Sequence, residues 1–257
     1  MRLLSTSRKA WLFLYFSYRR ELFEAIKIVI TIERDYFRIM NSIQKGNVLI
    51  TKKARYFYIG DLQSVTTEVI YVLHGYGMQA SEFIKEFEVL AQPGRIVIAP
   101  EGLSRFYRKG FSGDVVASWM TKDDRLDDID DYVRYLNDLH LHILDVIRQP
   151  SCKVNILGFS QGVATASRWI ANKTVKPLNF VAWCGDLASE IVDIASNFPI
   201  VTFVYSSDDQ FIPVAQAIER SKELSQKGFR VNEVFFEGQH VIDSQVLMNV
   251  WRQITTD

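Results

Sequence analysis

The residues best suited to chemistry in this sequence are five in a row, Gly-Phe-Ser-Gln-Gly at positions 158–162. They follow a strand-like run, residues 153–157, and precede a helix-like one, residues 163–171. A GxSxG pattern between a strand and a helix is typical of a nucleophile elbow, a sharp turn that lifts a serine hydroxyl toward a substrate. The glycines fit because a side chain at either position would collide with the neighbouring strand or helix. Ser160 is therefore the candidate nucleophile, and the competing interpretation is a serine that only caps the helix.

A serine nucleophile needs a base, and only one of the four histidines lies after Ser160 in the chain. That residue, His240, follows a strand-like run, residues 231–236, and precedes a helix-like run, so it belongs on a loop at a strand end. In triads built on such an elbow, the acid and the histidine follow the serine in that order. We therefore predict that His240 accepts the proton of Ser160.

Three aspartates are candidates for the acid that orients this histidine. Asp208 and Asp209 follow a buried β run, residues 200–205; one would hold the imidazole, and the other would cap the helix that begins near Pro213. Of the two, Asp209 is favoured. Asp186 is the third candidate, because some hydrolases place their acid one strand earlier.

Backbone amides beside the nucleophile can stabilise the negative charge that develops during acyl transfer. One amide should come from Gln161, the residue after the nucleophile. The other should come from Tyr76, on the glycine-rich loop that follows the strand-like residues 68–73. His74 on the same loop could act as a second base, but we favour a structural role that braces the turn.

Together these motifs resemble the carboxylesterase and acyl-protein thioesterase branch of the α/β-hydrolase superfamily. The resemblance covers about residues 45–257 and rests on HGxG at 74–77, GFSQG at 158–162, DxxxP at 209–213 and GxH at 238–240. It implies a triad of Ser160, Asp209 and His240, with Tyr76 and Gln161 as the amide donors. The DxxxP register selects Asp209 over Asp208.

The chain departs from the family pattern at three places. Val163 replaces a second glycine and Ile212 replaces a valine, and both changes are mild. Residues 118–120, Ser-Trp-Met, stand where the family often has a tryptophan followed by an aromatic residue and an aspartate. This third departure concerns the substrate more than the chemistry.

Strand-like and helix-like segments alternate from about residue 48, which predicts an α/β fold. We expect the α/β-hydrolase fold, with a mostly parallel central sheet of about eight strands and helices on both faces. Only about 16 residues, 184–199, separate two of the strands, so a large cap domain has no room there. One domain, residues 45–257, should follow an N-terminal extension of uncertain structure, residues 1–40. The expected strands are residues 48–51, 55–59, 68–73, 95–99, 153–158, 178–183, 200–205 and 231–236.

A loop over residues 101–122 is expected to cover the site, together with an aromatic residue beside the acid. Aromatic side chains lining the site in this way would suit an apolar acyl or aryl group of the substrate. The alternative is that these aromatic side chains only pin the loop to the body of the protein. The predicted substrate-binding residues are Phe106, Phe111, Trp119, Met120 and Phe211.

The composition excludes several other classes of function. Equal numbers of basic and acidic residues, 30 of each, remove the electrostatic argument for binding nucleic acid. Scattered histidines and two cysteines predict neither a metal site nor a disulfide framework, and no cofactor is expected. Free buried thiols are common in reducing compartments, so we expect a cytoplasmic location.

The first 40 residues contain an aromatic and apolar stretch, residues 10–18, that is too short to span a bilayer. With the helix-like residues 22–32, it could attach the chain to a membrane surface through residues 10–32, an interpretation we do not favour. Alternatively, Met40 is the start of translation, and the preceding residues are a poorly packed extension.

The sequence thus predicts a serine hydrolase that cleaves carboxylic esters or thioesters through an acyl-enzyme intermediate, acting on a small-molecule ester or acyl substrate. Two alternatives stay open. One is a hydrolase-fold binding protein without activity, and the other is an acyltransferase or a peptidase that uses the same triad.

Overall fold

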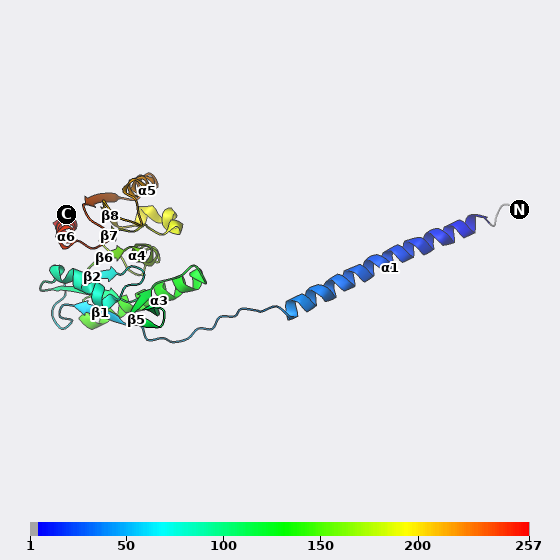
Figure 1. Ribbon diagram of the computed structural model, residues 1–257, viewed down its shortest axis with the longest axis horizontal. Coiled ribbons are helices and arrows are strands. Elements are labelled where there is room, and N and C mark those ends of the chain that lie inside the picture. Colours follow the sequence, from blue (N-terminus) through cyan, green and yellow to red (C-terminus); the bar gives the residue numbers. More distant parts are fainter. Residues whose placement is uncertain (1–4, 257) are drawn as a thin grey trace. The chain divides into compact units, whose positions relative to one another are not determined.

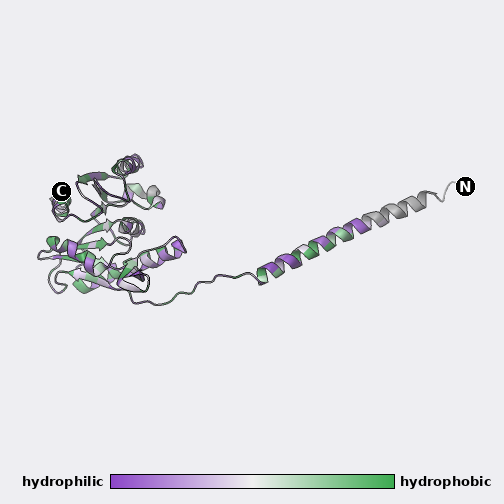
Figure 2. Ribbon diagram, in the orientation of Figure 1, coloured by the Kyte–Doolittle hydropathy of each residue, from purple (hydrophilic) through white to green (hydrophobic). Residues whose placement is uncertain are grey.

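The computed structural model describes the backbone of residues 5–256 and, within that range, the side chains of all residues except 5–14, 16, 17, 192–194, 196 and 256. The chain divides into two units between Lys52 and Lys53. The first contains one long helix, α1 (Ser5–Met40), in which every described side chain from Tyr18 to Met40 is exposed. Apolar and polar residues are interleaved along its described part (Figure 2). Within the described residues, no helix has an apolar stretch long enough to cross a lipid bilayer.

The prediction of a strand at residues 48–51 is wrong. Residues 43–55 have no regular secondary structure, and Val48, Leu49 and Ile50 are about four-fifths exposed, at 83%, 79% and 79%. A short β-branched run forms a strand only where it can pair with a neighbour and bury one face. Among the described residues these three do neither.

The second unit is built on a seven-stranded sheet with the order β1-β3-β2-β6-β7-β8-β9 (Figure 1). One edge strand, β1, pairs antiparallel with β3, and all other neighbours in this sheet are parallel. The expectation of a mostly parallel sheet is confirmed, with seven strands rather than about eight. The strands are β1 (Tyr56–Ile59), β2 (Glu68–Leu73), β3 (Arg95–Pro100), β6 (Lys153–Phe159), β7 (Asn179–Trp183), β8 (Ile200–Ser206) and β9 (Val231–Phe236).

Side chains alternate along each strand, so both faces of the sheet are apolar and both are covered. Tyr71 and Leu73 of β2 pack with one buried cluster, while Ile70 and Val72 pack with the other. The first cluster includes residues of α3 (Arg125–Ile147), α4 (Gln161–Ala171), α5 (Val214–Gln226) and the 3₁₀ helix η2 (Ser189–Asn197). The second includes residues of α2 (Ala80–Phe83), the 3₁₀ helix η1 (Ile84–Leu90) and α6 (Ser244–Thr256).

Two connections decide what can cover the carboxyl edge of the sheet. Between β7 and β8 the only described helix is the short η2, so the expected absence of a large cap is confirmed. The expected loop over residues 101–122 is instead largely a hairpin, because β4 (Ser104–Lys109) pairs antiparallel with β5 (Ser112–Ser118). Gly110 and Gly113, at φ 71° and 85°, allow the left-handed turn that reverses the chain.

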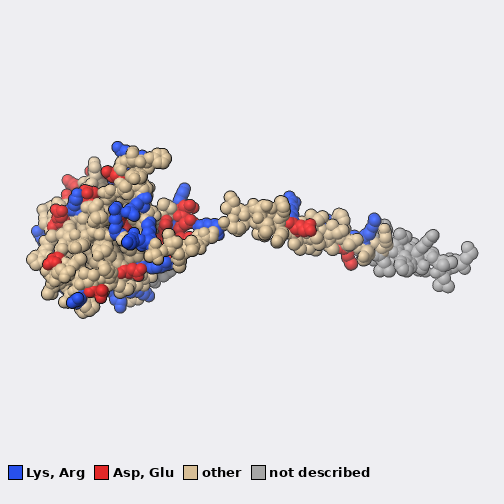
Figure 3. Space-filling view, turned by 90° about the horizontal axis from the view of Figure 1, so that it is seen from below, with Lys and Arg blue, Asp and Glu red and all other residues tan. Residues whose placement is uncertain are grey.

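Charges of both signs are distributed over the face of this unit seen in Figure 3. That distribution agrees with the equal numbers of basic and acidic residues in the sequence. In open parallel sheets, ligands commonly bind at the carboxyl edge of the strands, where the loops converge, so the candidate site is expected there.

Candidate active site

Ser160 stands at the turn between β6 and α4, with the backbone angles φ 54° and ψ −120°. A positive φ is costly for any residue with a Cβ, so the surrounding structure must hold it. The Ser160 amide donates to the carbonyl oxygen of Trp183 at 2.9 Å, and the Ser160 carbonyl oxygen accepts from the amide of Val163 at 3.0 Å. The elbow is therefore fixed from the neighbouring strand β7 and from the first turn of its own helix.

The glycines of the motif allow close approach of the backbone. A Cβ added to Gly158 would lie 2.5 Å from the carbonyl oxygen of Gly162, and one added to Gly162 would lie 2.1 Å from that of Leu73. Neither clash could be relieved without moving the strand or the helix. The loop after β2 is equally close, because a Cβ on Gly75 would lie 3.2 Å from the Cβ of Ser160.

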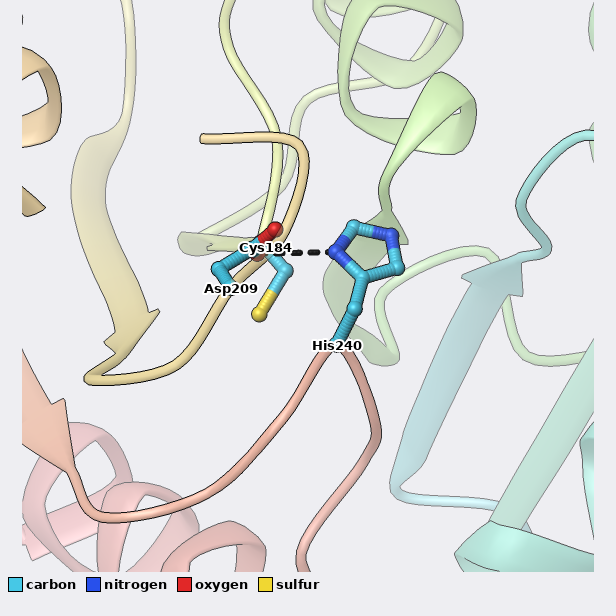
Figure 4. Close-up of side chains that lie close together, drawn as sticks. All are labelled: Cys184, Asp209 and His240. Carbon is cyan, nitrogen blue, oxygen red and sulfur yellow. Dashed lines mark hydrogen bonds and ion pairs between the residues drawn. The ribbon is translucent and has the colours of Figure 1, made fainter. Parts of the chain in front are cut away.

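Of the three candidate acids, Asp209 contacts the histidine. Its Oδ2 accepts a hydrogen bond from His240 Nδ1 at 2.8 Å (Figure 4). Asp186 instead accepts from Nε of Arg220 at 3.0 and 2.9 Å, and Asp208 is exposed. The geometry thus brings together the two residues that the sequence pairs, from the loops after β8 and β9.

The Asp209 side chain is 2% exposed, and its charge is stabilised from three directions. Its Oδ1 accepts from the amides of Phe211 at 2.8 Å and Ile212 at 3.1 Å, in addition to the bond from His240. Burial would raise the pKa of this carboxyl, but the bonds from His240 and the two amides outweigh burial and lower the pKa below its usual value. Asp209 is therefore ionised at neutral pH.

Asp209 also fixes the tautomer of the His240 ring. Because Nδ1 donates to the carboxylate, the proton of a neutral imidazole sits there and Nε2 is left as an acceptor. The rings of Phe159 and Phe211 each lie 4.8 Å from the His240 ring, centroid to centroid. Since Phe159 directly precedes Ser160, this contact holds the imidazole beside the elbow.

The two residues predicted to donate amides are Gln161, which directly follows the serine, and Tyr76, which follows Gly75 on the loop that approaches the serine. Gln161 is the first residue of α4, so its amide has no acceptor within the helix. Its side chain joins the elbow to the residues after β5: Oε1 accepts from the amide of Trp119 at 3.2 Å, and Nε2 donates to the carbonyl oxygen of Met120 at 2.9 Å. Tyr76 lies on the loop after β2, which the amide of Gly77 fastens to Ala117 O at 2.9 Å.

His74 is fully buried, and both of its ring nitrogens are occupied. Its Nδ1 donates to the carbonyl oxygen of Gly75 at 2.7 Å, and its Nε2 accepts from the amide of Gly102 at 3.0 Å. The Trp119 ring stacks on it at 5.0 Å and donates from Nε1 to the His74 carbonyl oxygen at 2.8 Å. Burial lowers the pKa of His74 to about 4. These contacts brace the turn and leave no nitrogen to act as a base.

Comparison with known proteins decides the family. A model of the phospholipase/carboxylesterase family matches residues 55–256, which include the elbow, Asp209 and His240. The chain belongs to this family. No curated protein matches the sequence closely enough to count as a relative.

Several solved structures share the fold at low sequence identity. Esterase PE8 superposes with a TM-score of 0.63 at 16% identity, covering 79% of this chain and 100% of its own. An acyl-protein thioesterase 2 of Zea mays gives 0.59 at 19% identity, covering 79% and 99%. A phospholipase/carboxylesterase of Dyadobacter fermentans gives 0.56 at 18%, covering 81% and 100%. At such identities the likeness establishes the fold alone.

Within this family fold, the five residues predicted to bind substrate occupy different surroundings. Phe211 is 65% exposed beside His240, Phe106 packs against Tyr76 with 5.6 Å between ring centroids, and Met120 is half-buried. The other two are placed elsewhere. Trp119 is 1% exposed because its ring is used to brace His74, and Phe111 is 101% exposed at the tip of the β4–β5 hairpin.

Cys184 is a residue of this edge to which sequence reasoning gave no role. It follows β7 with a positive φ of 45° and is 1% exposed. Its Sγ, a carboxylate oxygen of Asp209 and a ring nitrogen of His240 all lie within 4.8 Å of one another. No local pattern marks it, since only the meeting of three loops creates the cluster.

Proposed function

We propose that Ser160, His240 and Asp209 act as the catalytic triad of a hydrolase that cleaves carboxylic esters or thioesters. Membership of the phospholipase/carboxylesterase family supports an esterase-type hydrolase. The main support for the triad is the 2.8 Å hydrogen bond between Asp209 and His240. Both residues lie on loops at the carboxyl edge of the sheet, where the turn of Ser160 also lies.

The proposed chemistry follows the order of proton transfers in a serine triad. Neutral His240 takes the hydroxyl proton through Nε2 while the Ser160 oxygen attacks the carbonyl carbon. The amides of Tyr76 and Gln161 donate to the oxyanion, and His240 then gives its proton to the leaving group. A water molecule, deprotonated by the same imidazole, releases the acid and restores the serine.

Asp209 contributes through charge as well as orientation. Each proton transfer creates an imidazolium, and the ionised carboxylate beside it stabilises that cation in a site from which water is largely excluded. The two backbone amides on Oδ1 keep the carboxylate in place while Oδ2 faces the ring.

The substrate is proposed to carry an apolar acyl or aryl group. Tyr76, which follows Gly75 on the loop that approaches Ser160, packs against Phe106, and Phe211 packs against the imidazole of His240. Aromatic walls of this kind favour apolar groups, and the short β7–β8 connection leaves the edge open to a small molecule. A cytoplasmic location stays a prediction.

A hydrolysis panel tests this proposal. The substrates are p-nitrophenyl esters and acyl thioesters of increasing chain length, with Ser160→Ala as the matched control. We expect release of product by the wild type and a loss of at least about a thousandfold in the variant. If folded wild-type protein releases nothing above Ser160→Ala across the panel, the proposal fails, and the binding protein or another activity of the same triad takes its place.

A further inference from the structure

Three adjacent strands, β7, β8 and β9, end side by side, and the loop after each contributes one side chain to a cluster of possible metal ligands. These are Cys184, Asp209 and His240, and their sulfur, oxygen and nitrogen atoms lie within 4.8 Å of one another. The residue Cys184 is 1% exposed, and the side chains of Asp209 and His240 are 2% and 12% exposed. Figure 4 shows the three side chains close together, with the hydrogen bond between Asp209 and His240 marked.

We propose that Cys184, Asp209 and His240 form a binding site for a thiophilic divalent cation of the Zn²⁺ class, and that the bound cation switches the hydrolase off. The binding site stands on the geometry of the cluster. The switch rests in addition on the proposed function of His240 as the base.

The donor set selects the class of cation. A thiolate, an imidazole and a carboxylate are the ligands that Zn²⁺ and similar borderline-soft ions use, commonly three from the protein and one from a small oxygen ligand. Hard cations such as Ca²⁺ and Mg²⁺ require mostly oxygen ligands, which this cluster does not supply. Ser206 Oγ lies 4.0 Å from Cys184 Sγ and adds a nearby hydroxyl.

The charges of the proposed complex cancel. One divalent cation with one thiolate and one carboxylate is neutral, and neutrality favours a buried site because an uncompensated charge there is expensive. Asp209 needs little rearrangement, because Oδ1 keeps its bonds from the amides of Phe211 and Ile212 while Oδ2 changes its partner from Nδ1–H to the cation.

Binding of the cation would remove the proton of the Cys184 thiol and move the proton of the His240 imidazole. Without the cation the Cys184 thiol is protonated, because burial first and then the charge of Asp209 raise its pKa to about 12. Binding displaces that proton to solvent, so the ion must be thiophilic. The neutral imidazole of His240 keeps its single proton, which moves from Nδ1 to Nε2 when the cation takes the Nδ1 lone pair.

This tautomer shift is the proposed switch. Proton transfer from Ser160 requires a free lone pair on Nε2, and in the cation complex Nε2 carries the proton. The cation also takes from His240 the carboxylate bond that stabilises its charged form. The cation-bound protein keeps all three triad residues and cannot start the reaction.

Cadmium binding tests the site without any measure of activity. Cd²⁺ is titrated into the full chain, and the ultraviolet charge-transfer band between thiolate and Cd²⁺ is recorded. We expect a band that saturates at one Cd²⁺ per chain, disappears in Cys184→Ser and persists in Cys152→Ser, which removes the other free thiol. Zn²⁺ should compete the band away, and Asp209→Asn should weaken Cd²⁺ binding at least tenfold. Circular dichroism verifies that each variant is folded.

A band that survives in Cys184→Ser and vanishes in Cys152→Ser would place the cation elsewhere and overturn the proposed binding site.

The proposed switch is tested separately. Ester hydrolysis is measured with Zn²⁺ and then with excess chelator, and each rate is taken relative to the same variant without metal. We expect reversible inhibition of the wild type and an inhibitory concentration at least tenfold higher in Cys184→Ser. Equal inhibition of both would overturn the switch. A Cys184-dependent band in a chain that hydrolyses no ester would sustain the site and refute the proposed function.

Discussion

At the amino ends of its parallel strands, the sheet carries a buried polar cluster whose members bond to one another. Glu68 of β2 accepts from Arg95 Nε at 2.6 Å and from Asn155 Nδ2 at 2.8 Å, and Asn179 Nδ2 donates to Asn155 Oδ1 at 3.1 Å. At the carboxyl ends, Asp209 is equally well bonded, and His240 Nδ1 is bonded to it; among the described residues no hydrogen bond to His240 Nε2 is present, which leaves that nitrogen as an acceptor.

One sheet can therefore place groups that stabilise the fold at one edge and groups available for reaction at the other. A buried network whose members bond to one another holds strands together and makes the structure around it rigid. A network that ends in an available acceptor can take a proton from a nucleophile, which is the role proposed for His240 toward Ser160. We therefore expect substitutions at the amino edge to change the free energy of unfolding and those at the carboxyl edge to change the rate.

The largest effect should follow Asp209→Asn. An amide cannot stabilise an imidazolium and favours the wrong tautomer, so kcat/KM for ester hydrolysis should fall about ten-thousandfold. The matched control is Asp208→Asn, which alters the neighbouring, exposed carboxylate, whereas the bond to His240 comes from Asp209. Comparable losses in both variants would show that the Asp209–His240 pair has no special role.

The second-largest effect is expected from a substitution at the amino edge of the sheet. Glu68→Leu removes a carboxylate from a pair in which both side chains are 10% exposed, and it leaves the Arg95 charge without its partner. The free energy of unfolding, measured by urea titration, should fall by about 3–5 kcal/mol, and adding Arg95→Met should restore part of it. Glu82→Leu, at an exposed pair, should cost less than about 1 kcal/mol. A loss of kcat/KM in folded Glu68→Leu as large as in Asp209→Asn would break the contrast between the two edges.

The smallest effect is a pH dependence of stability that comes from His74. Its pKa is lowered to about 4 from the ordinary 6.5, so between these values the unfolded chain binds a proton that the folded protein does not. The free energy of unfolding should therefore decrease as pH falls from 6.5 to 4, by about 3 kcal/mol from this residue. His74→Gln should be less stable at pH 7 but should lose less stability over that range. Identical pH slopes for the two proteins would contradict the assignment.

Periodicity in the sequence predicted the parallel sheet well. Each parallel strand was placed within one residue at either end, as for β2 at residues 68–73 and β9 at 231–236. Such strands are buried on both faces and form short continuous apolar runs between turn residues, which is the strongest local signal for a strand. The expected elbow, and the histidine and acid on later loops, follow from chain order on that scaffold.

The features that the sequence did not predict depend on contacts between segments that are distant along the chain. The β4–β5 hairpin has mostly exposed residues and hence no burial pattern; its pairing is supported by contacts such as the bridge between Met78 and Ala117. Residues 48–51 have the composition of a strand, but they pair with no neighbour in the described part of the chain. Trp119 looked like part of a substrate wall and instead braces His74, and Cys184 gained its neighbours only where three loops meet.

Labelling with a fluorophosphonate probe tests most directly whether Ser160 is an activated nucleophile. The labelled chain is digested, and the modified peptide is identified by mass spectrometry. We predict one adduct, on Ser160, which is absent in Ser160→Ala, forms much more slowly in Asp209→Asn and forms at the wild-type rate in Asp208→Asn. An adduct on another residue, or none on Ser160 in folded protein, would contradict the proposed triad.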